Sequence, residues 1–244
     1  MKKLLLPALT ALLLAAALYG CAARDADTSA TPPASADASA AAATEPAAAP
    51  PTSEPLPLTE LAYSKTFPVS ETEVLYATAK YPQTGLAVID AYFADVLEKF
   101  DASADQLARD LSGYTEDGGG AAIPYELDDS YELKINGPYF FSVHRTIYSY
   151  MGGIHPSSDD KCDTFLIAGG RRVALAELFT VPRTEYTARL IAVFQAFMDE
   201  AGSDMFFSDA ADMLSESFPE DRYSVTEDGL EFYFPPIEIA PYAY

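Results

Sequence analysis

The pattern of apolar and polar positions divides the chain into an apolar leader, a long polar stretch and a remainder with regular periodicity. Alternation with a period of two predicts strands, and apolar residues three or four apart predict helices. Strands are expected over 61–69, 74–81, 125–135, 139–150, 162–167, 171–174, 223–226 and 230–234, and helices over 84–100, 103–111, 174–179, 184–200 and 208–218. This order predicts an α+β fold, a mostly antiparallel sheet with helices packed on one face.

The alternation is clearest in the strand expected over 139–150. One face would carry Tyr139, Phe141, Val143, Arg145, Ile147 and Ser149, and the other Phe140, Ser142, His144, Thr146, Tyr148 and Tyr150. Asn136-Gly137 before this strand and Asp228-Gly229 near the end of the chain are hairpin signals. Both pairs of flanking strands are therefore expected to be antiparallel neighbours.

Residues 1–20 have the form of a signal peptide, with two lysines ahead of an apolar run over 4–18. A run of about 15 residues is shorter than the roughly 20 that a helix needs to cross a bilayer. Leu18-Tyr19-Gly20-Cys21 resembles the lipobox of bacterial lipoproteins. That resemblance implies cleavage before Cys21 and a diacylglycerol on its sulfur, which would attach the protein to the membrane. Cleavage at the alanines of 15–17 as an ordinary secreted chain is the alternative.

Residues 21–57 consist almost entirely of Ala, Pro, Ser, Thr, Asp and Glu. Such sequence has too little apolar surface to offset the entropy of ordering it, so a disordered tether is expected. A wall-binding segment would need cations, and Arg24 is the single one there. The remainder, 58–244, has the usual size of one domain, with an N-terminal half over 58–130 and a C-terminal half over 131–244.

The charge of the chain restricts its partners. The net charge is −22, and the part from Glu60 onward holds 32 acidic and 12 basic residues. This balance opposes binding to nucleic acid, whose affinity comes from cationic contacts to phosphate, and to anionic lipid. It favours encounter with a cationic partner through long-range attraction. Solubility at an envelope surface is the plainer explanation of the same charge.

One segment, 148–156, stands apart as a candidate binding site. Tyr148 and Tyr150 would end a strand on the same face, and their rings offer apolar area with polar tips, which suits contact with protein or glycan. Gly152 and Gly153 permit backbone angles closed to other residues, and His155 would lie at the rim of the turn. These five residues are the predicted binding residues.

The same segment resembles the aromatic, Gly-Gly-x-His signature of a family of extracytoplasmic domains of poorly defined function. The family includes the outer domain of RsiV-type anti-sigma factors, which bind lysozyme, and the domain that precedes the catalytic part of some peptidoglycan deacetylases. The resemblance covers about 58–244 and includes the stretches 165–170, 173–179, 226–234 and 237–242. It implies a cationic protein such as lysozyme as the partner. Ile154 stands where the family usually has alanine.

The resemblance does not extend to the activities of those relatives. We identify neither a spanning helix after the leader nor a deacetylase domain, so we expect neither anti-sigma nor deacetylase activity. The expected function is that of a non-catalytic binding domain on the extracytoplasmic side of the cell membrane, or on an outer membrane if the organism has one. No cofactor and no metal are expected.

Other interpretations of the segment stay open. A hydrolase or deacetylase-like enzyme would use His155 as a general base oriented by a carboxylate. The carboxylates would come from Asp159, Asp160 or Asp163, and Ser157 or Ser158 would be the nucleophile. A metal site would pair His144 with His155, although no metal-binding spacing is present. In a purely structural protein, His155 would bond a backbone carbonyl in the turn. Cys162, beside an apolar run, is expected to be a small core residue.

Overall fold

The computed structural model of the chain describes residues 4–5, 54–116, 124–202 and 205–241. The predicted lipidation site at Cys21 and nearly all of the predicted leader and tether lie outside these ranges. None of the described helices combines the length and the apolar character that crossing a bilayer requires.

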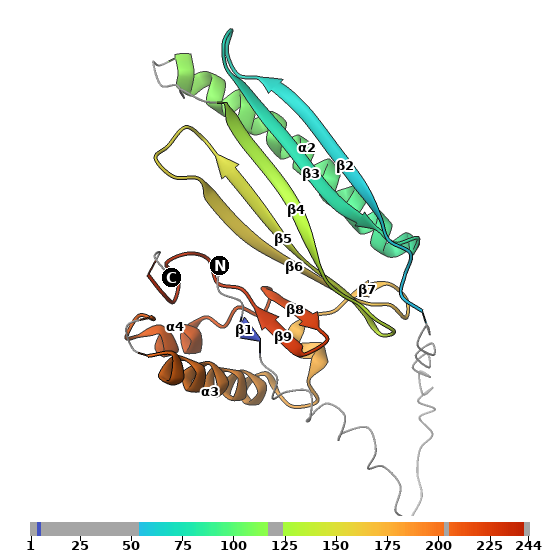
Figure 1. The fold of residues 1–244 in the computed structure, drawn as a ribbon, viewed down its shortest axis with the longest axis vertical. Helices are drawn as coiled ribbons and strands as arrows, with labels where there is room; N and C mark the ends of the chain where they lie inside the picture. The colour runs from blue at the N-terminus through green and yellow to red at the C-terminus, as the bar shows by residue number, and fades with distance from the viewer. Residues whose placement is uncertain (1–3, 6–53, 117–123, 203–204, 242–244) are drawn as a thin grey trace, which may run out of the picture.

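The largest element is a six-stranded sheet, which Figure 1 shows as one long layer. Its strands, in spatial order, are β2 (Thr59–Pro68), β3 (Val74–Gln83), β4 (Tyr125–Asn136), β5 (Phe140–Tyr150), β6 (Ser157–Leu166) and β7 (Arg171–Arg172). Neighbours pair antiparallel except β3 and β4, which pair parallel. Parallel neighbours need a crossover, and the long helix α2 (Ala87–Glu116) lies between these two strands in the sequence.

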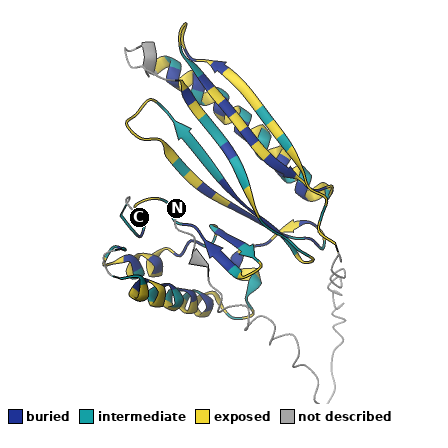
Figure 2. Ribbon diagram, in the orientation of Figure 1, coloured by how far each residue is buried: buried dark blue, intermediate teal, exposed yellow. Residues whose placement is uncertain are grey.

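Helix α2 covers one face of this sheet and forms the first hydrophobic core with it (Figures 1 and 2). Leu75 of β3, Tyr125 of β4 and Phe141 of β5, all at odd-numbered positions, point to the helix and are fully buried. Ile89, Phe93 and Phe100 project from the helix into the same core. Even-numbered residues of these strands therefore form the opposite face of the sheet.

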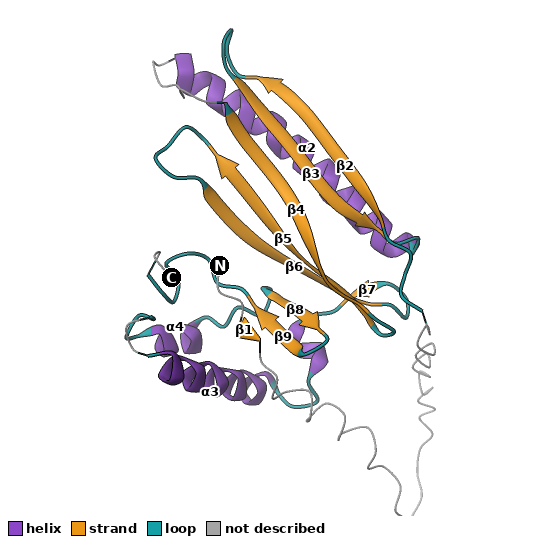
Figure 3. Ribbon diagram, viewed as in Figure 1, coloured by secondary structure: helices purple, strands orange, loops and turns teal. Residues whose placement is uncertain are grey.

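The C-terminal unit packs on that opposite face. Its elements are η2 (Leu175–Leu178), α3 (Arg183–Ala201), α4 (Ala210–Glu216), β8 (Tyr223–Thr226) and β9 (Gly229–Phe232), and β1 (Leu4–Leu5) pairs with the edge of β9 (Figure 3). The two helices form a second core with the small sheet. The unit meets β5 where the backbone N–H of Val225 donates to Ser142 Oγ at 3.2 Å and the ring of Tyr233 stacks on His144 at 3.8 Å.

The α+β class with a mostly antiparallel sheet is confirmed, and both hairpins occur at the predicted turns. Two local expectations are corrected. Helices were expected over 84–100 and 103–111, but α2 runs unbroken from Ala87 to Glu116, and no glycine or proline interrupts it between 87 and 112. The strand expected to begin at Cys162 begins at Ser157, because its first residues pair along β5 as far as Ser149.

Candidate functional site

The predicted site begins at the end of β5 and continues into the connection to β6. Tyr148 and Tyr150 are half-buried residues on the same face of the strand, as their spacing predicted. Residues 152–156 are exposed, and the side chain of Ile154 is 93% accessible. Gly152 has φ of +83°, which explains a glycine there, whereas Gly153 has no positive φ. The two tyrosines thus lie on the sheet, and Gly152, Gly153 and His155 lie in the exposed hairpin tip beyond it.

The tyrosines belong to a larger surface on the face of the sheet away from α2. The strand register places Tyr76, Glu126 and Tyr150 in one row across β3, β4 and β5. The next row holds Thr78, Asp128, Tyr148 and Ser158. We call Tyr76, Thr78, Glu126, Asp128, Tyr148 and Tyr150 the open face. Neighbouring strands lie about 4.8 Å apart, so the side chains of each row form one continuous surface.

The open face combines aromatic area with negative charge. Tyr76 is 46% exposed, and Thr78 and Glu126 are also exposed. The hydroxyl of Thr78 donates to Asp128 Oδ2 at 2.7 Å, which fixes that carboxylate on the surface. Because tyrosine presents a rigid ring and a polar tip, and because carboxylates attract cations, the arrangement suits a ligand with exposed cationic and apolar groups.

The C-terminal unit limits the open face on one side. It covers β5 at Ser142 and His144, and it leaves the strand end at Tyr148 and Tyr150 accessible. At this boundary His144 Nε2 lies 2.8 Å from Asp160 Oδ1, and both side chains are almost fully buried. The open face is therefore accessible from the strand end at Tyr150 back toward the buried pair of His144 and Asp160, where the C-terminal unit begins to cover the sheet.

Two of the carboxylates considered for catalysis, Asp160 and Asp163, lie on opposite faces of the sheet. Asp160 pairs with His144 beneath the C-terminal unit. Asp163 lies on the face that α2 covers and accepts a hydrogen bond from Tyr92 at 2.5 Å. Within the ranges that the structure describes, no group of three or more His, Cys, Asp and Glu residues could hold a metal ion.

A charged cluster lies under α2, directly behind the open face. The guanidinium of Arg145 lies between Asp129 and Asp163, with Nη1 3.6 Å from Asp129 Oδ2 and Nε 3.4 Å from Asp163 Oδ2. The side chains of all three residues are at least 93% buried. Tyr81 donates to Asp129 at 2.7 Å, and Arg172 lies 3.0 Å from Asp163. The sequence placed Arg145 on the same strand face as Phe141 and Val143 but gave no sign of these partners.

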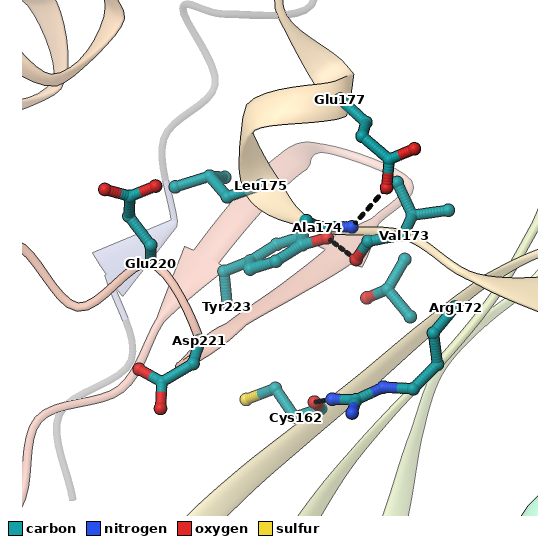
Figure 4. Close-up of a pocket in the computed structure, with 10 residues that line it drawn as sticks. Cys162, Arg172, Val173, Ala174, Leu175, Glu177, Glu220, Asp221 and Tyr223 are labelled. Carbon is teal, nitrogen blue, oxygen red and sulfur yellow. Dashed lines mark hydrogen bonds between the residues drawn. The ribbon is translucent and has the colours of Figure 1, made fainter. Parts of the chain in front are cut away.

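A pocket lies where the C-terminal unit meets β6 and β7, and Figure 4 shows the residues around it. Its volume is about 440 Å³. Most of its polar groups are engaged already, since Tyr223 donates to the carbonyl of Val173 at 2.5 Å and Arg172 donates to that of Cys162 at 3.1 Å. Glu177 accepts from the backbone N–H of Ala174 at 2.8 Å. The bond from Tyr223 joins the C-terminal unit to the segment that follows β7, so we assign the pocket to the joint between the two parts of the fold.

Cys162 at this pocket is expected to be chemically inert. Burial raises the pKa of its thiol to about 12, so almost none of it is thiolate near neutral pH. In a full-length Cys21→Ser chain, where it is the single cysteine, we expect labelling by iodoacetamide at pH 8 to be roughly a thousandfold slower than in the unfolded chain. Mass spectrometry with and without guanidinium measures this. Comparable rates in both states would show that the thiol is accessible and ionised in the folded protein.

The comparison with known proteins supports the fold. No protein-family model matches the sequence, and no curated protein matches it. A crystal structure of a DUF3298 family protein from Pseudomonas aeruginosa PAO1 matches with a TM-score of 0.54 at 15% identity, covering 79% of this chain and 88% of that chain. A member of the same family from Bacteroides fragilis NCTC 9343 matches with a TM-score of 0.55 at 19% identity, covering 77% and 87%. The chain therefore has a fold similar to that of DUF3298 family proteins, and at these identities the likeness concerns the fold alone.

Proposed function

We propose that the chain is a lipid-anchored protein of the cell envelope whose folded part binds a cationic wall-active protein without catalysis. Lysozyme is the example that the family resemblance suggests. The observation that carries the proposal is the open face, on which Tyr76, Tyr148 and Tyr150 surround Glu126 and Asp128. Interfaces are enriched in tyrosine, and complementary charge speeds encounter and selects the partner.

The hairpin tip extends this surface. Ile154 is the most exposed large apolar residue of the described chain, and it follows directly on the strand that carries Tyr148 and Tyr150. An apolar side chain with an accessibility of 93% contributes nothing to the core, whereas it would lose much of its contact with water against a partner. The proposal therefore places Ile154 and His155 at the margin of the interface.

The anchor is the second part of the proposal. Cys21 would carry the lipid and hold the protein on the extracytoplasmic side of the cell membrane, or on an outer membrane if one is present. The support comes from the lipobox-like residues 18–21. Two or three acyl chains give lasting attachment, because each buried CH₂ contributes about 0.8 kcal/mol.

A pull-down with the full-length Cys21→Ser chain and hen lysozyme tests the binding. We expect retention at about 20 mM salt and at least a tenfold loss at about 0.5 M, because salt shortens the range of charge attraction from some 20 Å to a few Å. An acidic protein of unrelated fold with similar net charge serves as the control. Equal retention by the control, or none by this chain at low salt, would contradict the lysozyme proposal. Hydrolysis or deacetylation of wall material by the purified chain would contradict its non-catalytic character.

Wall glycan is a second candidate ligand, and the exposed tyrosine rings are what favours it, because sugars pack against aromatic faces. The two candidates differ in their response to salt. Glycan is not expected to depend on the carboxylates of Glu126 and Asp128, so its retention would persist at high salt. Sedimentation with purified insoluble peptidoglycan at both salt concentrations separates them.

A further inference from the structure

The end of the large sheet at which residues 54–58 enter the fold differs from the open face in its surface composition. Four segments meet there: residues 55–58 ahead of β2, 83–89 at the start of α2, 135–141 around the β4–β5 hairpin, and 167–170 in the β6–β7 turn (Figure 1). We call these four segments the tether end. The β5–β6 hairpin tip lies at the opposite end of the same sheet, because β5 starts at the tether end and finishes at Tyr150.

Hydrogen bonds and close packing join the four segments into one surface. The backbone N–H of Leu56 donates to Asn136 Oδ1 at 2.9 Å, and Asn136 Nδ2 donates back to the Leu56 carbonyl at 2.8 Å. The backbone N–H of Ile167 donates to the Tyr139 carbonyl at 2.9 Å. A Cβ at Gly170 would lie only 3.0 Å from the side chain of Val88, so the turn rests directly on the start of α2.

This surface is apolar, and its acidic neighbours Glu54 and Asp90 lie just outside the four segments. Tyr139 is 56% exposed, Val88 is 53% exposed and Leu58 is 39% exposed. None of the four segments contains an aspartate or a glutamate, although the chain as a whole has a net charge of −22. An exposed apolar patch on a soluble domain indicates a contact surface. Because Asp90 is engaged by Thr84, this surface should attract a cationic partner less strongly than the open face does.

We propose that the tether end rests on the lipid surface to which Cys21 attaches the chain, so that the open face and the hairpin tip point away from it. The proposal rests on the lipid anchor under Proposed function. Tyrosine is enriched at membrane interfaces, where its ring meets acyl chains and its hydroxyl meets water, and Tyr139 is placed for this role. Burial of the neighbouring aliphatic side chains of Val88 and Leu58 in the lipid interface would lower the free energy, because their apolar surface would leave water. Anionic lipid repels free carboxylates, and the four segments contain none; the neighbouring Asp90 already accepts hydrogen bonds from Thr84.

Because the anchor already holds the domain near the membrane, even a weak contact between the tether end and the lipid surface would be populated. The stretch between Cys21 and Glu54 has about 30 residues and reaches at most roughly 120 Å when fully extended. Chain attachment of this kind gives effective concentrations approaching the millimolar range. If the leader is cleaved before Cys21 as proposed, the remaining chain enters the described fold at Glu54, so the tether end is the part of the domain nearest to the anchor along the mature chain.

The absence of tryptophan from the chain allows a direct test. Tyr139→Trp places a probe at the tether end, and Ile154→Trp places the matched control at the opposite end. The lipidated variants are reconstituted into phosphatidylcholine vesicles that contain brominated phosphatidylcholine, which quenches tryptophan. Co-sedimentation with the vesicles measures attachment, and the Cys21→Ser chain is the control without the lipid. We expect a blue shift and quenching for the probe at position 139, and neither for the probe at 154.

Each other outcome overturns the proposal in a distinguishable way. Vesicle-bound protein without quenching at position 139, or with equal quenching at both positions, removes the docking and leaves the anchor intact. Failure of the lipidated chain to co-sediment, or equal co-sedimentation of the Cys21→Ser chain, removes the anchor and the docking together. A blue shift at 139 that appears without vesicles and rises with protein concentration assigns this surface to a second copy of the chain.

Discussion

Replacing Arg145 with methionine is expected to lower the free energy of unfolding by about 3–5 kcal/mol. Methionine keeps much of the apolar volume of the side chain and removes its charge. The two carboxylates that flank Arg145 are buried under α2, and without the guanidinium Asp129 would keep its hydrogen bond from the hydroxyl of Tyr81 but no cation. A buried carboxylate without a compensating cation is unstable because it has lost its hydration. Urea denaturation followed by far-ultraviolet circular dichroism measures the loss.

A matched substitution separates this effect from the general loss of an arginine. Arg171 pairs with Glu177 at the surface, with side-chain accessibilities of 54% and 42%. Water screens such a pair, so Arg171→Met is expected to lower stability by no more than about 1 kcal/mol. Similar losses of unfolding free energy for the two variants would show that the burial of the Arg145 cluster does not increase its contribution to stability.

The response to pH identifies the carboxylate responsible. Burial raises the pKa of Asp129 above its ordinary value, and the charge of Arg145 opposes that rise. A carboxyl group with a raised pKa stabilises the folded state in its protonated form, and this contribution is lost as the pH rises through the folded pKa. Removing Arg145 raises that pKa further, so the difference between wild type and Arg145→Met should be larger at pH 7.5 than at pH 5. Adding Asp129→Asn to the variant should recover part of the loss at pH 7.5; no recovery would assign the effect to packing.

The sequence predicted this fold well wherever the information was local. The alternation in β5, the Asn136-Gly137 turn and the Asp228-Gly229 turn each specify a strand or a hairpin from a few neighbouring residues, and all three occur. The parallel pairing of β3 with β4 could not be predicted in this way. The two strands are separated by a long helix, and their register is set by the core that they share with α2.

In the candidate site, too, local features were predicted from the sequence and features that depend on the pairing of distant strands were not. Tyr148 and Tyr150 were predicted to share a face because a strand alternates with a period of two, and the structure places them so. Tyr76 was missed, because it reaches the same surface through β3 and only the pairing of three strands brings it into the row of Tyr150. Arg145 was missed as a buried charge for a similar reason. Its carboxylate partners come from β4 and β6, and nothing in the strand itself indicates them.

The combined substitution of Tyr148 and Tyr150 by alanine is expected to weaken lysozyme retention by about 2 kcal/mol or more, roughly a thirtyfold rise in Kd. Both rings lie on the open face next to Glu126 and Asp128, where a partner would cover them together. Binding energy concentrates in a few such aromatic residues near the centre of an interface. Surface plasmon resonance with the full-length Cys21→Ser chain at low salt gives the Kd, and circular dichroism checks that the fold is retained.

Controls at other positions make the result specific to this face. Tyr139→Ala removes a more exposed tyrosine at the tether end and is expected to leave the Kd unchanged. Glu126→Lys should slow association at low salt and lose its effect at high salt, since an exposed charge acts mainly through steering. Glu98→Lys makes the same charge change on the exposed side of α2, across the sheet from the open face, and should have a smaller effect. Equal losses for the tyrosine variants at both ends, or equal slowing by both charge reversals, would mean that lysozyme responds to overall composition and that the open face is not its binding site.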